Sequence, residues 1–501
     1  QRDERLGWTG DTQVFAGTAC FNMDSAAFFA KFTYDLAQEQ NKFDGRVPYT
    51  VPDAHLGRGG SSAWGDAATI VPWTAYEFYG DRSILAQQFE SMRAWVDYIK
   101  GEDDASGGKR LWTTGFHFGD WLALDGNDTN SPMGGTPEDF ISSAYYFKSA
   151  QLVARAASVL GKKELAEQYA ALAAEIKTAI QNEYFTPTGR LAINTQTGYT
   201  LALFMDLVPE EFRQRVMDDL VSRLRKDKVH LRTGFVGTPY ICRVLSENGA
   251  NDLAYQLLLN EDYPSWLYAV NLGATTIWER WNSLNPDGTI SSSGMNSLNH
   301  YAYGSIVEWM YREMCGLNPS SGDDAVTGFR RAWIAPKPDK ALAWARASYL
   351  SAAGLFESGW EIDQQGNLCF EITIPFNAEA QVVLPDAEVG EVSLNGEPLK
   401  SGGQVGDSVV LKLRAGRYVI DYTPTRPYSE VLSTYSPIPK LLQNKKAAAF
   451  LAEQFPAVAD LDEFRLAAIG NACIREIAET PFIVLTEEQM DELDRRLQEM
   501  R

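Results

Sequence analysis

The spacing of apolar residues changes once along this chain of 501 residues, and that change constrains the fold more than any other feature. In the first part, apolar side chains recur every three to four residues, the period of a helix with one buried face. From about Phe329 onward they alternate with polar ones, as in Cys-Phe-Glu-Ile-Thr-Ile-Pro-Phe at 369–376, which is typical of strands. The sequence therefore predicts helices followed by strands. The clearest predicted helices cover 81–102, 141–161, 162–185, 210–228, 251–260 and 297–317.

Signals at the ends of these segments agree with this division. Asp81 is suited to cap the start of one helix, Gly161 to end another, and Pro239 to occupy a first helical turn. Asn395-Gly396 is the commonest dipeptide of tight hairpins. Helix pairs that recur over some three hundred residues without a repeat of fixed length favour a closed ring of helices over a regular solenoid.

The sequence predicts a mainly α chain in three parts. A helical domain covers 1–325, a β-sandwich of short strands joined by Gly and Asn turns covers 326–426, and a helical tail covers 427–501. Thr486 is a plausible N-cap within the tail. The tail has no catalytic motif, so packing or interaction is the role we expect for it.

Charge and composition exclude several classes of partner. The chain has 66 acidic and 45 basic residues, a formal charge of −21, which repels phosphate backbones and anionic membranes. No run of 18 apolar residues is present. The five cysteines have no close pairs and the four histidines are scattered, which argues against a disulfide framework and a zinc site. We expect no nucleic-acid or membrane partner and no required cofactor; a structural calcium ion is compatible with the acidic surface.

The first motif that points to chemistry is the opening stretch, QRDERLGWTGD at 1–11. A general acid in a glycosidase must stay protonated near neutral pH, and an apolar wall beside a carboxyl raises its pKa. Trp8 is suited to form such a wall, and Asp3 or Glu4 is the candidate acid. The alternative is a surface ion-pair network at a chain end.

The second motif is GATTIWERW at 273–281, in which Glu279 lies between Trp278 and Arg280. A base that activates water needs partial desolvation to be basic and a nearby cation to stay charged. Glu279 meets both conditions. The alternative is a structural Glu–Arg pair under two core tryptophans, because buried ion pairs perturb pKa values as well.

Two further motifs, SSAWGDA at 61–67 and HFGDWLALD at 117–125, each place Trp next to Gly-Asp. Trp64, Asp66, Asp120 and Trp121 are candidates for a sugar subsite in which rings stack on the sugar and carboxylates hold hydroxyls. The alternative is that the tryptophans are core and the aspartates cap helices. His300 is a possible hydroxyl-binding group, although a lone histidine is more often structural.

Together these motifs resemble a known family. QRDERLGWTGD, SAWGDA, GDWL, GFVGTPYI, TTIWERW and NHYAYGSIVEWMYREMCGL resemble, in order across residues 1 to about 425, the signature set of bacterial α-L-rhamnosidases, glycoside hydrolase family seventy-eight. The resemblance implies an (α/α)6 barrel followed by a β-sandwich. It also implies inverting hydrolysis that releases terminal, non-reducing α-L-rhamnose.

Carried over by position, the resemblance assigns the general acid to Glu4, with Asp3 as the second choice, and the general base to Glu279. It implies that six residues surround the sugar: Arg2, Trp8, Asp11, Trp64, Trp121 and His300. The motifs add Asp3, Asp120 and Trp278 to the predicted substrate-binding set. Because an inverting pair leaves room for a water, we expect the two carboxyl groups to lie roughly 6.5–9.5 Å apart.

The sequence departs from the family pattern at its start. The family usually has Asp-Cys-Pro just before the first motif, and here the chain begins after that point. We therefore expect an incomplete barrel that lacks one sugar contact and an initial helix. Three alternatives stay open: a non-catalytic rhamnose-binding protein, an inactive shortened fragment, and another (α/α)6 hydrolase that acts on glucosides or acidic sugars. The aglycone, the oligomeric state and the compartment have no signal in the sequence.

Overall fold

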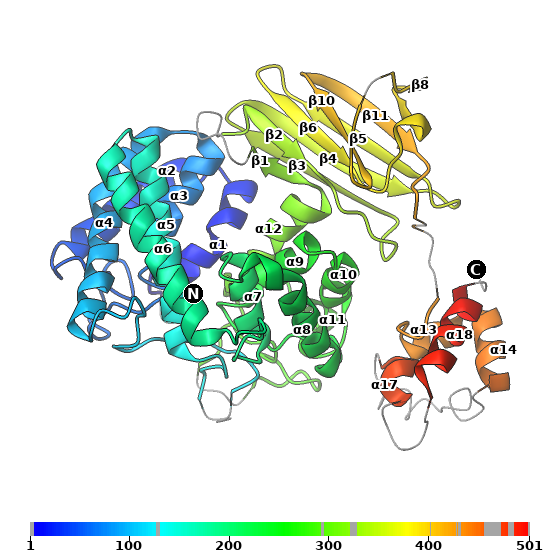
Figure 1. Ribbon diagram of the computed structural model, residues 1–501, viewed down its shortest axis with the longest axis horizontal. Helices are drawn as coiled ribbons and strands as arrows, with labels where there is room; N and C mark the ends of the chain where they lie inside the picture. The colour runs from blue at the N-terminus through cyan, green and yellow to red at the C-terminus, as the bar shows by residue number, and fades with distance from the viewer. Residues whose placement is uncertain are drawn as a thin grey trace.

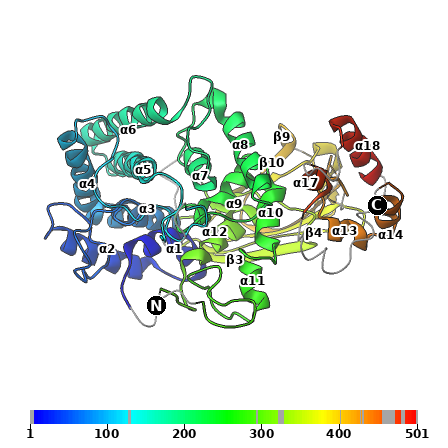
Figure 2. The same ribbon diagram turned by 90° about the horizontal axis from the view of Figure 1, so that it is seen from below.

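The computed structural model describes residues 5–126, 131–291, 295–320, 328–400, 402–426, 428, 432–454, 472–478 and 485–498. A helical amino-terminal region is followed by a region of β-sheets and by a helical tail (Figure 1). The view in Figure 2 also places the first helices and the tail at opposite sides, with the strands between them. This order is the one that the change of period predicts.

The helical region contains helices α1 to α12 together with short 3₁₀ and π turns. Their bounds are α1 Thr9–Asn22, α2 Ala26–Gln40, α3 Ala67–Tyr79, α4 Arg82–Ala105, α5 Glu138–Val159, α6 Lys163–Tyr184, α7 Gln196–Phe204, η1 Glu210–Phe212, α8 Arg213–Lys226, α9 Thr238–Glu247, α10 Asn251–Leu259, α11 Trp266–Asn271, η2 Ala302–Ser305, α12 Ile306–Trp309 and η3 Met310–Met314.

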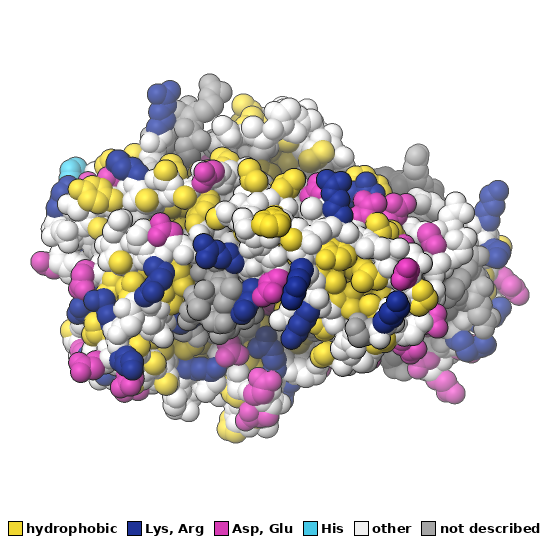
Figure 3. Space-filling view, turned by 90° about the horizontal axis from the view of Figure 1, so that it is seen from above, with side chains coloured by type: hydrophobic (Ala, Val, Ile, Leu, Met, Phe, Trp, Pro, Cys, Tyr) yellow, Lys and Arg dark blue, Asp and Glu magenta, His cyan; other side chains and the backbone are white. Residues whose placement is uncertain are grey.

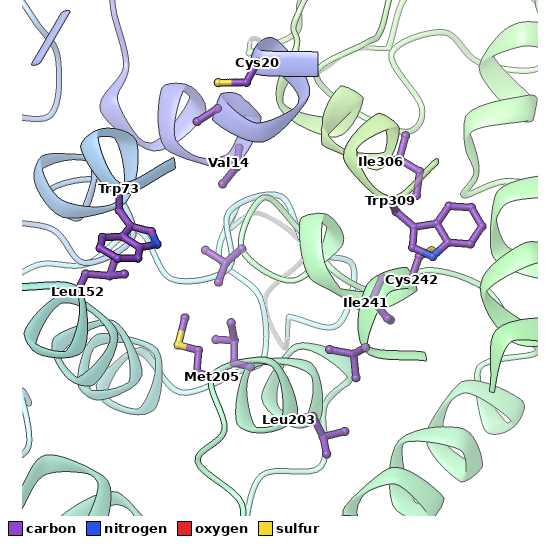
Figure 4. Packing of buried hydrophobic residues seen from close by; sticks show 14 of the residues in the cluster. Val14, Cys20, Trp73, Leu152, Leu203, Met205, Ile241, Cys242, Ile306 and Trp309 are labelled. Carbon is purple, nitrogen blue, oxygen red and sulfur yellow. The ribbon is translucent and has the colours of Figure 1, made fainter. Parts of the chain in front are cut away.

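Consecutive helices pair, and alternate helices contact one another in turn. α3 packs on α4, α5 on α6, α7 on α8 and α9 on α10. In addition, α1 contacts α3, α3 contacts α5, α5 contacts α7, α7 contacts α9, α9 contacts α12, and α12 contacts α1. We call α1, α3, α5, α7, α9 and α12 the ring helices. Figure 4 shows buried side chains from all of them, among them Val14, Trp73, Leu152, Leu203, Ile241 and Ile306.

The signals that predicted helix ends act as expected. The Asp81 carboxylate accepts a hydrogen bond of 2.8 Å from the Ser83 N–H at the start of α4. Gly161 follows α5 with φ +74°, a conformation that glycine adopts at low cost. Pro239 occupies the first turn of α9, where a missing N–H is harmless. The local sequence therefore fixes where these helices start and stop.

The strands form two sheets. Their bounds are β1 Leu317–Pro319, β2 Arg331–Ile334, β3 Trp344–Ser351, β4 Gly354–Ile362, β5 Leu368–Ile374, β6 Glu379–Leu384, β7 Val392–Leu394, β8 Glu397–Pro398, β9 Gly403–Val405, β10 Ser408–Leu413 and β11 Gly416–Tyr422. One sheet has the order β1-β2-β6-β10-β9 and the other β3-β4-β5-β11-β7-β8. All pairs are antiparallel except β2 with β6. Asn395 and Gly396 join β7 to β8 with φ of 53° and 81°, as their hairpin signal predicts.

The helical region and the sheets share one continuous apolar core. The Phe21 ring at the end of α1 stacks on Tyr311 with centroids 4.4 Å apart and meets Tyr349 of β3 edge-on at 5.2 Å. Trp360 of β4 donates from its indole nitrogen to the Met314 carbonyl at 2.8 Å. The change from helix to strand comes at Leu317, earlier than the boundary at 325 that the sequence analysis gives, because β1 follows η3 directly.

The tail is helical, as predicted, in the part that the structure describes. It contains α13 Ile438–Gln443, α14 Lys445–Gln454, α17 Ile474–Ala478 and α18 Glu487–Gln498. Thr486 accepts a hydrogen bond from the Gln489 N–H at 3.3 Å, which makes it the cap that the sequence predicts. Leu441, Leu451 and Leu497 belong to a second apolar cluster, separate from the main core.

Among the described residues, every helix is too short or too polar to cross a bilayer. On the face shown in Figure 3, Lys and Arg side chains are interspersed with Asp and Glu. That face therefore has no continuous basic patch of the kind that binds phosphate backbones.

Candidate functional site

The first three predicted site residues, Arg2, Asp3 and Glu4, lie outside the described residues. The distance between the Glu4 and Glu279 carboxyl groups therefore stays a prediction. The structure does place the rest of the opening motif, from Arg5 onward. The site can be built from there.

The opening motif runs beside the segment 49–51 before it enters α1. The Thr9 N–H donates to the Tyr49 carbonyl at 3.0 Å, and the Val51 N–H donates to the Gly7 carbonyl at 2.8 Å. The Thr12 hydroxyl then donates to the Trp8 carbonyl at 2.9 Å in the first turn of the helix. Trp8 is thus held on both sides by backbone hydrogen bonds, with its side chain half-buried.

Five aromatic rings, one of them Phe116 at 5.1 Å between centroids, surround Phe118. Its ring lies 4.5 Å from Trp64, 5.8 Å from Trp8, 5.4 Å from Trp121 and 4.9 Å from Tyr49, measured between centroids. The structure therefore brings together three tryptophans that the sequence predicts for a sugar subsite, from three motifs far apart in the chain. Phe118 and Tyr49 are additions that the sequence analysis missed.

Trp64 is held by the turn that leads into α3. It is buried beneath α1, and a side chain at Gly10 would overlap its ring at 2.6 Å. The Asp66 carboxylate accepts from the Ala63 N–H at 2.7 Å, from the Trp95 indole at 2.9 Å and from the Ser149 hydroxyl at 2.6 Å. Burial raises the pKa of Asp66. These three donors occupy the Asp66 oxygens. Asp66 therefore stabilises the turn before α3 instead of contacting a sugar.

Asp120 has a structural environment as well. Its fully buried carboxylate accepts hydrogen bonds from the Gly234, Val236 and Gly237 N–H groups at 2.9, 2.8 and 3.2 Å, and from the Thr197 hydroxyl. Burial raises the pKa of Asp120 to about 6, although each of these donors favours the charged form. The Asp120 oxygens hold the loop that leads into α9, and the substrate-binding role stays a prediction.

His117 fixes the loop that carries Phe118. Its Nδ1 accepts from the Ser62 N–H at 3.1 Å, and its Nε2 lies 3.1 Å from the Thr114 carbonyl. Burial lowers the pKa of His117 to about 4, so the ring is neutral at physiological pH. The Phe118 N–H donates to the Ser61 hydroxyl at 3.2 Å. The loops that carry Trp64 and Trp121 are thereby tied together.

Glu279 lies on a loop whose backbone pairs with the segment 297–300. The Glu279 N–H donates to the Ser297 carbonyl at 2.9 Å, and the His300 N–H donates to the Ile277 carbonyl at 2.8 Å. The Glu279 side chain is half-buried, whereas its neighbour Trp278 is buried. This arrangement matches the mixture of desolvation and access that a general base needs.

The rest of the TTIWERW motif anchors this loop. Trp281 stacks on Tyr303 with centroids 4.1 Å apart and meets Trp266 edge-on at 5.2 Å. Arg280 donates from Nε to the Met295 carbonyl at 2.7 Å. Trp281 and the arginine therefore support the loop, while the substrate-binding role predicted for Trp278 and the catalytic role predicted for Glu279 stay predictions.

His300 and Asp11 join the Glu279 loop to the opening motif. His300 Nε2 lies 3.0 Å from Asp11 Oδ1, and both side chains are about 95 % buried or more. The two atoms are close but are not aligned for a hydrogen bond, and Asp11 Oδ1 has no hydrogen-bond partner among the described residues. A hydroxyl group of a bound molecule would satisfy this buried acceptor.

A cavity of about 330 Å³ opens beside Glu279. Trp278 and Arg280, the residues on either side of Glu279, both line it, together with Trp281 and Tyr303. The Trp281 indole N–H is buried and has no partner among the described residues. Water or a small ligand group in this cavity can therefore reach the Glu279 loop and the indole donor.

Metal chemistry has no visible support in the part of the chain that the structure describes. There, no three His, Cys, Asp or Glu side chains converge in a way that would hold a metal ion. All five cysteines are free. The absence of a required cofactor and the possibility of a structural calcium ion stay predictions.

The sequence carries a local signal for Phe118 but none for Tyr49, the two aromatic residues that the sequence analysis missed. Phe118 stands beside Gly119 in the HFGDW stretch, so the motif itself carries a signal for it. Tyr49 lies in a segment with no motif, and only the backbone pairing with Thr9 brings it to the site. A contact between segments forty residues apart is not readable from local patterns.

Comparison with known proteins gives the chain its family. The family model described as the bacterial alpha-L-rhamnosidase 6 hairpin glycosidase domain matches residues 1–314, and the bacterial alpha-L-rhamnosidase C-terminal domain matches residues 316–397. The chain belongs to the bacterial α-L-rhamnosidase family. The family match covers both the helical region and most of the sheets, so the resemblance seen in the motifs is confirmed.

Individual family members are similar over most of this chain. An alpha-L-rhamnosidase of Streptomyces avermitilis is 39% identical over 384 residues, 77% of this chain and 35% of its own length. One of Formosa agariphila is 39% identical over 405 residues, 80% of this chain and 42% of its own length. This chain therefore spans between about a third and less than half of the length of these rhamnosidases.

Solved rhamnosidase structures share the fold. The crystal structure of the Streptomyces avermitilis alpha-L-rhamnosidase complexed with L-rhamnose superposes with a TM-score of 0.76 at 37% identity, over 84% of this chain and 39% of that one. The native rhamnosidase of Aspergillus terreus gives 0.75 at 32% identity, over 84% of this chain and 46% of that one. The order of helices followed by strands is thus a property of the family.

Proposed function

We propose that this protein hydrolyses glycosides and releases terminal, non-reducing α-L-rhamnose. Family membership supports the substrate, because the relatives at 39% identity are alpha-L-rhamnosidases. The observation that carries the proposal is the junction of Asp11 and His300, since it joins the opening motif to the Glu279 loop in one place. The half-buried Trp8 and Trp121 rings beside Phe118 supply faces on which a deoxy-sugar can stack.

The proposed architecture is an (α/α)6 barrel. The ring helices contact one another in a closed order, α1-α3-α5-α7-α9-α12, and α4, α6, α8 and α10 each pack on at least one of them. Asp11 lies in the first turn of α1, Thr197 at the start of α7 and Thr238 at the start of α9, close to the residues of the candidate site. The amino-terminal ends of these helices, which carry partial positive charge, thus favour carboxylates and sugar oxygens there.

In the proposed mechanism Glu4 protonates the glycosidic oxygen and Glu279 takes a proton from a water that attacks C1 from the opposite face. The configuration at C1 is then inverted. The half-buried Glu279 side chain supports the role of base, because the attacking water has to reach this carboxylate from the side away from the leaving group. Asp11, His300, Trp8, Trp64 and Trp121 position the sugar.

A panel of nitrophenyl glycosides tests this function. We expect hydrolysis of the α-L-rhamnoside and none of the α-glucoside, together with saturable binding of free L-rhamnose in calorimetry. Rhamnose binding without turnover of any glycoside would show a binding protein and contradict the proposal. Turnover of the α-glucoside or of an acidic sugar glycoside in place of the rhamnoside would assign the chain another substrate.

A further inference from the structure

A second cavity, of about 500 Å³, lies at the end of the ring helices opposite the proposed sugar site. Glu77, Arg155 and Met205, at the carboxyl-terminal ends of α3, α5 and α7, line it. Trp333 of β2 and Lys337 line it as well, so the cavity lies where the helical region meets the sheets. Its volume and its place between two regions are typical of sites that bind small molecules.

Two cations of α5 face this cavity without a carboxylate partner. Lys148 and Arg155 are seven residues apart, about two helical turns, so they lie on the same face of α5. Among the described residues, neither side chain forms a salt bridge or a hydrogen bond. The other cations that line the cavity, Arg243, Arg312 and Lys337, each have a carboxylate oxygen within 2.7 Å. Lys148 and Arg155 are therefore available to a ligand.

Aromatic rings lie beside both cations. Lys148 lies over the Phe204 ring at 5.9 Å, and Arg155 lies over the Trp73 ring at 4.2 Å. Leu152, between the two cations on α5, lines the same cavity and lies beside Trp73 in Figure 4. These apolar neighbours lower the local dielectric constant, which strengthens the attraction of either cation for an anion.

The charges around Lys148 do not compensate its ammonium group. Burial lowers the pKa of Lys148 to about 8. The negative charges of Glu77 and Asp206 oppose this shift, whereas the positive charges of Arg155 and Arg243 add to it. The folded protein thus holds Lys148 as a cation at a cost in free energy, and a bound anion would remove that cost.

Glu77 is a third unpaired group of the same cavity. It lines the cavity from α3 and lies beyond salt-bridge distance of every described cation. A carboxylate there repels a doubly charged ion such as hydrogen phosphate, and it accepts hydrogen bonds from hydroxyl groups. Two cations and one acid together fit a ligand with a single negative charge and several hydroxyl groups.

We propose that this cavity binds a small polyhydroxylated carboxylate, with the carboxylate group between Lys148 and Arg155 and a hydroxyl group on Glu77. Seven residues span about 10.5 Å along a helix, a distance that a lysine and an arginine side chain can close from both ends. The proposed mechanism uses none of these three residues. The site is therefore separate from the proposed hydrolysis.

D-Gluconate and D-sorbitol are a matched pair of probes, because they differ only at one end, where a carboxylate replaces an alcohol. Calorimetry at pH 7 should give a Kd of about 1 mM for gluconate, as expected for two charge-assisted contacts. Sorbitol should bind at least about tenfold more weakly. Inorganic phosphate should also bind more weakly than gluconate, because Glu77 repels its second charge. Saturating L-rhamnose should leave the gluconate affinity unchanged.

Substitutions of the two cations test the assignment. Lys148→Met and Arg155→Met should each weaken gluconate binding about tenfold or more, because each loses one charged contact. Arg155→Lys, which keeps the charge, should retain most of the affinity. Rhamnoside hydrolysis should be unchanged in all three variants, which also shows that they are folded.

Lys162→Met is the control variant. Lys162 also lies over a phenylalanine ring, Phe89 at 5.1 Å, but it is outside the residues that line this cavity. It should leave gluconate binding unchanged. Absence of gluconate binding, or binding that Lys148→Met does not weaken, would overturn the site. Competition by L-rhamnose would place gluconate at the sugar site and overturn it too.

The class of ligand has its own test. Phosphate that binds more tightly than gluconate, or sorbitol that binds equally well, would overturn the proposal of a polyhydroxylated carboxylate. Each of these outcomes leaves the proposed function standing, because rhamnoside hydrolysis is measured separately. Conversely, failure to hydrolyse any rhamnoside would refute the proposed function without affecting gluconate binding.

Discussion

The two ends of the ring helices carry different kinds of side chain. At the starting end, aromatic rings and a few buried acids surround the proposed sugar site. At the other end lies a cavity of about 500 Å³ lined by Glu77 of α3, Arg155 of α5, Met205 after α7, Glu247 of α9 and Glu308 of α12. Figure 4 shows how Trp73, Leu152 and Met205 come from different helices near this space. We call it the far-end cavity.

Most charges of the far-end cavity are paired within the protein. Arg312 lies 2.6 Å from Glu308, and Arg243 lies 2.7 Å from Glu247. Lys337 of the sheet region lies 2.6 Å from Glu313. Such pairs satisfy buried charges but leave little for a ligand.

Glu77, Lys148 and Arg155 are the exceptions in the described part of this cavity, because none of them lies within salt-bridge distance of an opposite charge among the described residues. Arg155 lies over the Trp73 ring at 4.2 Å, and Lys148 over the Phe204 ring at 5.9 Å. The carboxyl-terminal ends of helices carry partial negative charge, which favours cations there. The comparison teaches that the starting end gathers aromatic rings around one buried acceptor without a hydrogen bond among the described residues, Asp11 Oδ1, whereas the far end pairs most of its charges within the protein.

The largest expected effect comes from comparing one substitution at each end of the ring helices. Glu279→Gln should lower kcat for rhamnoside hydrolysis by roughly a thousandfold, because water loses its general base, with rhamnose binding retained. Glu308→Gln at the far-end cavity should leave kcat within about twofold and lower the melting temperature. Steady-state kinetics and calorimetry on both variants check this. An active Glu279→Gln would remove that residue from the role of base.

Asp11→Asn tests the open acceptor at the starting end. A charged acceptor that binds a sugar hydroxyl contributes about 1.5–3 kcal/mol, so kcat/KM should fall by roughly 10- to 100-fold. Asp252→Asn, which also changes an acid in a first helical turn but lies on α10, should lower stability slightly and leave kcat/KM unchanged. An equal loss of activity in both variants would show that Asp11 acts through stability alone.

Asp120→Asn separates a structural role of this residue from the predicted substrate-binding role. An amide nitrogen would face two or more of the N–H groups of the loop 234–237, so the free energy of unfolding should fall by about 2–4 kcal/mol. Denaturant unfolding followed by tryptophan fluorescence measures it. Unchanged stability with a strongly raised KM would restore Asp120 to the sugar-binding set.

Lys148→Met is expected to have the smallest effect, and its sign depends on pH. Burial lowers the pKa of Lys148 from 10.5 to about 8, so the folded protein disfavours the proton that the unfolded chain keeps. The wild-type protein therefore gains stability as the pH rises from about 8 to 10.5. At pH 7 the methionine variant should melt about 2 °C higher, and this gap should shrink toward pH 10. A gap that widens with pH would show that Lys148 is stabilised as a cation.

Local sequence signals predicted much of the fold. The change of period separated helices from strands. Helices and strands also start or end as the local chemistry predicts at Asp81, Gly161, Asn395 and Thr486. The boundary at 325 came out too late, because β1 has only three residues and no period can be read from so short a strand.

The candidate site was predictable only where a single motif contains both the functional residue and the neighbours that indicate its role. Trp8, Trp64 and Trp121 meet around one ring, and Phe118 at the centre of that group was not chosen because phenylalanine next to Gly-Asp-Trp is equally typical of a core. Asp120 was predicted to bind the sugar because Trp121 stands next to it; its four donors, from residues 77 to 117 positions away, cannot be read from the motif. Partners that distant decide whether a buried acid is structural or functional.

The anomeric form of the first product tests the central claim most directly. Proton NMR that follows the hydrolysis of an aryl α-L-rhamnoside from its first seconds shows which anomer appears before mutarotation. We expect β-L-rhamnose first, because Glu279 activates a water on the face opposite the leaving group. Release of α-L-rhamnose first would contradict the roles assigned to Glu4 and Glu279.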